Sequence, residues 1–281
     1  MISVYLLIFI TVISWLPHLQ KIAFVGFAIF LGAGFYLGQL DYDAIRIAIL
    51  LCALVFLSGH EDRRIRIVCS AGMVFFTLIL FSHKHPGFHN VKIWDAITLS
   101  DKSAPATLYF NFDKPLFGVL FLIFYGKQIT FQSSKRQFVA SITNSLLPLL
   151  AIVITIGISI DFIVFDPKIG SEYLIWAANN LLLVCVSEEI FFRGFLQREL
   201  CALLSRWKYG EWLAVIAAAI LFGIAHFSGG LGYVMLSIIA GFFYGLSFKQ
   251  TKTIESPILV HFLLNSVHFL FFSYPYYLPS P

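Results

Sequence analysis

The stretch LLLVCVSEEIFFRG, residues 181–194, carries both the fold class and the functional question. Its first six residues are all apolar, as expected inside a lipid bilayer. Two adjacent carboxylates, Glu188 and Glu189, and the guanidinium of Arg193 then follow. Ionisable side chains are costly at membrane depth, so each of them is a candidate for function.

The composition of the whole chain is that of a membrane protein. Of its 281 residues, 59% are hydrophobic and 12% are charged, whereas soluble domains have about 25% charged residues. The sequence has no basic run interleaved with aromatic residues, the pattern that would indicate nucleic-acid binding. We therefore assign the net charge of +4 to cytoplasmic loops. The sequence therefore predicts an all-α, polytopic integral membrane protein that has the lipid bilayer, and no nucleic acid, among its partners.

Spanning helices need about 20 mostly apolar residues. The ten candidate spans are 2–16, 22–40, 44–58, 65–82, 106–125, 138–165, 173–192, 212–227, 231–248 and 254–274. The fifth is the weakest, because Asp113 and Lys114 interrupt it. We predict about eight to ten transmembrane helices. Residues 1–130 would form N-terminal helices of unknown role with an extracytoplasmic loop at about 83–105, and residues 138–275 a separate helical core.

Lysine and arginine are unevenly distributed over the connections between these spans. Twelve lie in odd-numbered connections and six in even-numbered ones. Because cytoplasmic loops carry the excess of basic residues, the odd-numbered connections are predicted to be cytoplasmic and both termini extracytoplasmic. The N-terminal segment has no basic region or small-residue cleavage site, so we interpret it as a first span and not as a signal peptide.

Helix geometry separates the roles of the two glutamates. Glu189 and Arg193 are four residues apart, in the better orientation for an ion pair on a helix. Glu188 lies about 100° around the helix, on the neighbouring face. One carboxylate is then neutralised by arginine while the other stays available. A poorly solvated carboxylate binds protons more readily than it does in water, which suits a general base or acid near neutral pH.

Further polar residues follow on two later helices. Phe222 and His226, in LFGIAHFSGG, are four residues apart, and so are His261 and Asn265, in LVHFLLN. An imidazole and an amide one turn apart can donate two hydrogen bonds to one oxygen, as in an oxyanion hole made of side chains.

Each polar cluster also has an ordinary structural explanation. A glutamate–arginine pair can pin two helices, a lone histidine can be packed in the interior, and a histidine with an asparagine can link helices by hydrogen bonds. The pair Asn179 and Asn180 precedes the glutamates on the same helix and adds a fourth cluster. Three ordered clusters within about 80 residues favour a functional site over coincidence.

The predicted depths of these residues leave one inconsistency. Glu188 lies near the cytoplasmic end of the seventh span, and His261 lies about 10 Å into the tenth span from the same side. His226 falls late in the eighth span, toward the other side. For all three to meet, that helix must begin later than Trp212, tilt, or be drawn into a cavity.

Two other groups of potential ligands are interpreted as non-functional. HKHPGFH places His83, His85 and His89 in a solvated loop without a carboxylate at ligand spacing, so no specific metal site is expected there. The four cysteines lie in apolar segments at spacings that fit neither a zinc ribbon nor a disulfide framework, so we expect small buried side chains.

The ordered motifs resemble those of the CPBP intramembrane proteases, a family that includes CAAX prenyl endopeptidases, bacteriocin-processing enzymes and abortive-infection-like proteins. The family pattern EExxxR is EEIFFR here, at residues 188–193. FxxxH is FGIAH, at residues 222–226, and HxxxN is HFLLN, at residues 261–265. The resemblance covers about residues 138–275 and does not extend to the first 130 residues.

The resemblance implies a CPBP-type helical core and hydrolysis of a peptide bond. Glu188 would activate water as the general base, and His226 would help to hold that water. His261 and Asn265 would stabilise the tetrahedral oxyanion. Supporting positions would be Glu189, Arg193 and Phe222.

No cofactor is favoured, and zinc is the alternative. Glu188, His226 and His261 could ligate zinc with an open fourth position. The HExxH helix of many zinc proteases is, however, absent from the sequence. We therefore favour a glutamate-type mechanism over a metal-dependent one.

The leading hypothesis is an intramembrane endopeptidase in the cytoplasmic (inner) membrane of a bacterium, acting on a peptide or a membrane-associated protein. The alternative is a non-catalytic membrane scaffold or bacteriocin-immunity protein that retained the fold. A proton-coupled transporter also places glutamates and histidines in spans, but no internal repeat is visible and the polar residues crowd into one half of the chain.

Overall fold

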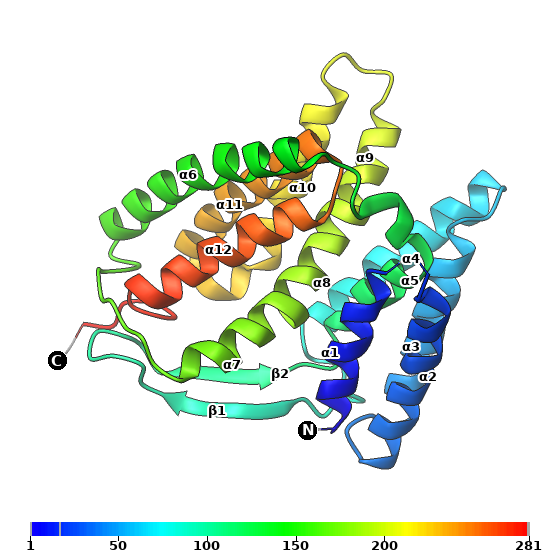
Figure 1. Ribbon diagram of the computed structural model, residues 1–281, viewed down its shortest axis with the longest axis horizontal. Coiled ribbons are helices and arrows are strands. Elements are labelled where there is room, and N and C mark those ends of the chain that lie inside the picture. Colours follow the sequence, from blue (N-terminus) through cyan, green and yellow to red (C-terminus); the bar gives the residue numbers. More distant parts are fainter. Residues whose placement is uncertain (1, 17, 280–281) are drawn as a thin grey trace. The chain divides into compact units, whose positions relative to one another are not determined.

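The computed structural model describes residues 2–16 and 18–279. The chain divides into two compact units, whose elements are labelled in Figure 1. Unit 1 comprises the residues up to 93 together with 109–128 and 182–187. Unit 2 comprises 94–108, 129–181 and the residues from 188 onward.

Two helices of unit 1 begin at aspartates that cap them. Asp41 accepts hydrogen bonds from the backbone N–H groups of Asp43 and Ala44, and Asp62 accepts one from the N–H of Arg64. Such caps satisfy N–H groups that have no partner within the helix. The helices of this unit are α1 (Ile2–Ser14), α2 (Gln20–Tyr36), α3 (Tyr42–Leu57), α4 (Arg63–Phe81) and most of α5 (Pro115–Ile129).

A buried carboxylate holds together the segment between α4 and α5. The side chain of Asp113 is fully buried. It accepts hydrogen bonds from His83 Nδ1 at 2.9 Å, from Asn90 Nδ2 at 3.2 Å and from the backbone N–H of Lys114 at 2.8 Å. The loop histidine therefore has a carboxylate partner, which local spacing could not reveal because the two residues are 30 positions apart.

Two strands lie where a loop and the beginning of a span were predicted. β1 (Val91–Ile97) and β2 (Ala106–Phe110) pair as a two-stranded sheet (Figure 1). The predicted span 106–125 is wrong at its start, because α5 begins only at Pro115. Ala106 and Phe110, on one face of β2, are buried while the residues between them on the other face are exposed, which is the two-residue period of a strand.

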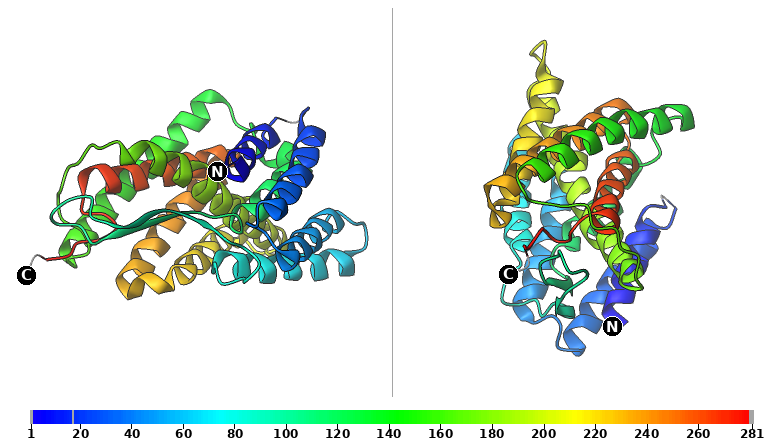
Figure 2. Two further views of the ribbon diagram at one scale, coloured as in Figure 1. Left: turned by 90° about the horizontal axis from the view of Figure 1, so that it is seen from below. Right: turned by 90° about the vertical axis from the view of Figure 1, so that its left-hand side faces the viewer.

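Unit 2 is a group of long helices. α11 packs against α6, α10 and α12, and α12 also packs against α6 (Figures 1 and 2). The helices are α6 (Lys135–Ser159), α7 (Glu172–Asn179), α8 (Val186–Glu189), α9 (Arg198–Leu203), α10 (Gly210–Ala225), α11 (Gly230–Thr251) and α12 (Glu255–Phe271). α7, α8 and α9 are joined by π-helical turns into one helix from Glu172 to Leu203.

The chain is an all-α polytopic membrane protein. Four helices among the described residues are long and apolar enough to cross a membrane, namely Arg63–Phe81, Lys135–Ser159, Glu172–Leu203 and Phe227–Thr251. Shorter apolar helices are Ile2–Ser14, Gln20–Tyr36, Pro115–Ile129 and Gly210–Ala225. The total of eight to ten transmembrane helices stays a prediction. Cys69 and Cys185 are buried, and Cys52 and Cys201 are half-buried.

One end of unit 2 is tied together by the C-terminal tail. Ser273 and Tyr277 donate backbone hydrogen bonds to the carbonyls of Val164 and Phe162. On its other side, the tail pairs with residues 102–104. Lys168 donates to the carbonyl of Phe272 at the end of α12. Burial lowers the pKa of the Lys168 ammonium, and the nearby carboxylate of Asp166 opposes that shift.

Candidate active site

The two glutamates lie between π-helical turns in the middle of the long helix Glu172–Leu203. One π-helical segment, Asn180–Cys185, precedes them, and a second, Ile190–Gln197, follows them directly. Such i→i+5 turns are rare, and they occur frequently at functional sites. They also bend and rotate the helix locally, so the faces cannot be assigned from a regular period of 3.6 residues.

Glu189 is the centre of a buried ion pair. Its Oε1 accepts hydrogen bonds from Arg193 NH1 at 3.0 Å and from His261 Nδ1 at 2.8 Å. The side chains of Glu189 and Arg193 are completely buried. The predicted four-residue pairing is therefore confirmed, and Glu189 also holds one ring nitrogen of His261.

Arg193 is enclosed by aromatic rings and by a close approach of α11. Its guanidinium carbon lies 4.6 Å from the ring centre of Phe222 and 5.3 Å from that of Tyr244, within the range of cation–π attraction. Its NH2 donates to the carbonyl of Gly241 at 2.9 Å. A Cβ at Gly241 would lie 3.1 Å from Ala219 Cα and 3.1 Å from Arg193 NH2, so this contact requires glycine.

A second side chain repeats the same contact one turn further along. Gln197 is buried, and its Nε2 donates to the carbonyl of Gly245 at 3.0 Å. Arg193 and Gln197 are four residues apart, as are Gly241 and Gly245, so the two hydrogen bonds form a ladder between the helices. This ladder fixes the depth of the ion pair relative to α11.

Glu188 faces two imidazoles. Its Oε2 lies 4.0 Å from His226 Nε2 and 4.0 Å from His261 Nε2. The carboxylate is buried, and the side chain of His226 is 19% exposed. Three residues from three separate helices, all predicted as catalytic, are thus brought together.

The other nitrogen of each imidazole is held by an oxygen. His226 Nδ1 lies 2.7 Å from the backbone carbonyl of Phe222. A carbonyl can only accept, so His226 Nδ1 carries a proton, and a neutral His226 therefore presents the lone pair of Nε2 toward Glu188. His261 Nδ1 likewise donates to the carboxylate of Glu189.

The length of the seventh span removes the inconsistency in depth. The helix continues beyond Phe192 to Leu203, so Glu188 lies in its middle and not near its end. From Glu188 to Leu203 the chain rises about 22 Å, and from Gly210 to His226 it returns about 24 Å. The two residues are therefore at nearly the same depth, and α10 begins at Gly210, before Trp212.

Asn265 is held by Asn180, a member of the fourth polar cluster. Its Nδ2 donates to Asn180 Oδ1 at 3.2 Å. Asn180 lies at the beginning of the first π-helical segment. This bond orients the side-chain amide of Asn265.

Tyr244 is a site residue that the motifs do not include. Its ring stacks on that of His261, with centroids 4.5 Å apart and planes inclined by 16°. Phe222 contacts the same imidazole edge-on, at 5.8 Å. Tyr244 and His261 lie on different helices, so only the folded structure reveals this contact.

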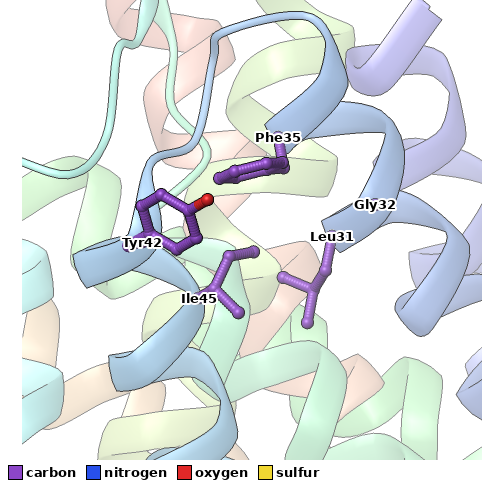
Figure 3. Close-up of a pocket in the computed structure, with 5 residues that line it drawn as sticks. All are labelled: Leu31, Gly32, Phe35, Tyr42 and Ile45. Atoms are coloured by element: carbon purple, nitrogen blue, oxygen red, sulfur yellow. The ribbon is translucent and has the colours of Figure 1, made fainter.

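A recess elsewhere lacks comparable chemistry. Figure 3 shows an open recess between α2 and α3, lined by Leu31, Gly32, Phe35, Tyr42 and Ile45. Its lining is apolar apart from the Tyr42 hydroxyl. Such a surface suits contact with lipid chains and supplies no acid, base or metal ligand.

Comparison with known families agrees with the geometry. Residues 170–267 match the family model described as type II CAAX prenyl endopeptidase Rce1-like. This match supports the resemblance to the CPBP family. The matched segment contains all three motifs, and it indicates a CAAX-type intramembrane protease. No curated protein and no solved structure matches the chain.

Proposed function

We propose that this chain is an intramembrane endopeptidase in which Glu188 activates water to hydrolyse a peptide bond. The observation that carries the proposal is the placement of Glu188 Oε2 at 4.0 Å from the Nε2 atoms of both His226 and His261. A carboxylate and two imidazoles from three parts of the chain converge in the buried interior. A scaffold would not need that convergence.

The spacing suits a water bound between carboxylate and imidazole. A gap of 4.0 Å is too long for a direct hydrogen bond, but it can be bridged by one water with two bonds of about 2.8 Å. Such a water donates one hydrogen to Glu188 and the other to the Nε2 lone pair of His226. Its own lone pair is then directed at the substrate.

In the reaction, the water oxygen attacks the carbonyl carbon while Glu188 takes one of its protons. The carbonyl oxygen becomes an oxyanion. When the C–N bond breaks, Glu188 returns the proton to the leaving nitrogen. The products are a new carboxylic acid, which keeps the second hydrogen of the water, and a new amine, so Glu188 ends in its initial state.

The oxyanion is assigned to His261 and Asn265. Glu189 orients His261, which in its doubly protonated form donates its Nε2–H to the oxyanion, and the side-chain amide of Asn265 donates alongside it. Arg193 balances the charge of Glu189, and Phe222 holds both Arg193 and His226. Each role agrees with the one that the family resemblance implies.

The positions of Glu188, His226 and His261 also test whether zinc could bind at this site. One carboxylate and two imidazoles, each with its Nδ1 held by an oxygen, form a donor set that zinc accepts. Neighbouring ligand atoms of tetrahedral zinc are about 3.3–3.5 Å apart, whereas here they are 4.0 Å apart. Among residues 2–16 and 18–279, no group of three or more such ligands is placed to hold a metal. We therefore propose the metal-free mechanism.

The substrate is proposed to be a peptide precursor or membrane-anchored protein, cleaved in the cytoplasmic membrane of a bacterium. The test compares protein termini in host cells carrying wild type or Glu188→Ala, at matched membrane abundance. New termini that require Glu188 would support proteolysis and identify the substrate. Identical sets under several growth conditions would contradict it and favour the scaffold. Activity that survives a zinc chelator supports the metal-free mechanism, and activity restored only by zinc overturns it.

A further inference from the structure

The two ends of unit 2 carry opposite charge. One end holds seven cations and three carboxylates, Glu199, Glu211 and Glu255. We name these cations the basic collar, and they are Lys135, Arg136, Arg198, Arg206, Lys208, Lys249 and Lys252. The loops 98–104 and 160–172 at the other end hold four carboxylates and two cations. The two ends of unit 2 are about 38 Å apart along α6.

The contacts place the collar at one end. Gln137, at the start of α6, donates to the carbonyl of Gln250 near the end of α11. Lys249 and Lys252 reach Glu211, at the start of α10, at 3.5 and 3.1 Å. Three predicted cytoplasmic connections therefore meet there, although they are far apart in sequence.

The turn between α9 and α10 is exposed along residues 205–209. It projects past the ends of α6 and α12 in Figure 1 and in the right-hand view of Figure 2. Trp207 is 64% exposed and Tyr209 is 62% exposed. Arg206 and Lys208 are also exposed, and neither pairs with a carboxylate among the residues that the structure describes.

The length of the preceding helix brings at least one of its ends to a membrane surface, and the composition of this turn is typical of such an end. A helix of 32 residues is about 48 Å long, whereas the hydrocarbon core of a bilayer is about 30 Å thick. At least one end must therefore reach the headgroups. Tryptophan and tyrosine are enriched at that level, and lysine and arginine there are attracted to anionic lipids.

We propose that residues 203–209 form a binding site for anionic phospholipid headgroups, with Arg206 and Lys208 as the cationic contacts and Trp207 and Tyr209 at the headgroup level. The other cations of the basic collar add electrostatic attraction to the anionic lipids within a Debye length of about 10 Å. The inference is independent of the catalytic proposal, because it uses none of the residues at Glu188.

The test uses the full chain reconstituted in phosphatidylcholine vesicles that contain a minority of brominated lipid. Bromine quenches tryptophan only at short range, and the signal of Trp207 is obtained by subtracting that of Trp207→Phe. We expect brominated phosphatidylglycerol to quench Trp207 more than brominated phosphatidylcholine at the same fraction. This preference should fall as salt is raised.

A matched pair of variants locates the site. The double variant Arg206→Gln/Lys208→Gln should lose roughly half or more of the preference of Trp207 for brominated phosphatidylglycerol. Each cation near an anionic surface contributes about fivefold in affinity. The control variant Lys84→Gln/Lys102→Gln removes the same amount of charge from exposed loop positions, and it should keep the lipid preference of the wild type. Equal quenching by both lipids in the wild type, or an equal loss in both variants, would overturn the proposal.

Discussion

The two units bury polar groups in different ways. Asp113 is the buried carboxylate of unit 1 within the described residues, and three donors in its own neighbourhood satisfy it. Unit 2 buries Glu188, Glu189 and Arg193 on one helix and His261 on another. Burying an ionised group is costly unless it is paired and hydrogen-bonded. Asp113 therefore has the arrangement of a structural residue, whereas Glu188 is directed at two imidazoles beyond hydrogen-bond distance.

The largest effect on stability is expected at the Glu189–Arg193 pair. Arg193→Met leaves Glu189 buried without its cation, so the free energy of unfolding should fall by about 3–5 kcal/mol. The control is the double variant Glu189→Gln/Arg193→Met, which removes both charges and should lose less. Denaturant unfolding in detergent measures both. If the single variant is no less stable than the double one, the pair does not hold the site.

A smaller loss is expected in unit 1. Asp113→Asn keeps the shape of the side chain but weakens its bonds to His83 and Asn90, so the free energy of unfolding should fall by about 1–3 kcal/mol. The rate at which each folded molecule cleaves its substrate should stay at the wild-type value. A folded Asp113→Asn protein without activity would show that unit 1 contributes to the chemistry, and the contrast between the units would fail.

The smallest effect is expected from the ring that positions His261. Tyr244→Leu removes a stacking contact worth about 0.5–1.5 kcal/mol, so kcat should fall by up to about tenfold. Tyr244→Phe keeps the ring and should keep the rate. Equal kcat in both variants would exclude a positioning role.

Much of the site could be predicted because its residues fall in short sequence motifs. The spacing of Glu189 and Arg193 predicts their ion pair, and the motifs identify His226 and His261. The depth of Glu188 could not be predicted, because the predicted span ended before Arg193, as hydropathy places a charge at a membrane surface. Arg193 is neutralised inside the protein, so the helix continues to Leu203.

Other features depend on contacts between distant residues. Gly241 and Gly245 accept from Arg193 and Gln197 only because α11 approaches closely. The π-helical turns beside Glu188 leave no signature in composition. β2 was assigned to a span because its residues are apolar, although its short alternating pattern is that of a strand.

The most direct test of the central claim compares two glutamates on the same helix. The assay measures cleavage in vesicles by the purified wild type and by its Glu188→Gln and Glu199→Gln variants. The substrate is one identified by comparing the protein termini of host cells. Glu199 is exposed, so its variant should cleave at the wild-type rate. Glu188→Gln should keep the fold and lose roughly 10²–10⁴-fold in kcat. Cleavage by a folded Glu188→Gln protein at the wild-type rate would contradict the account.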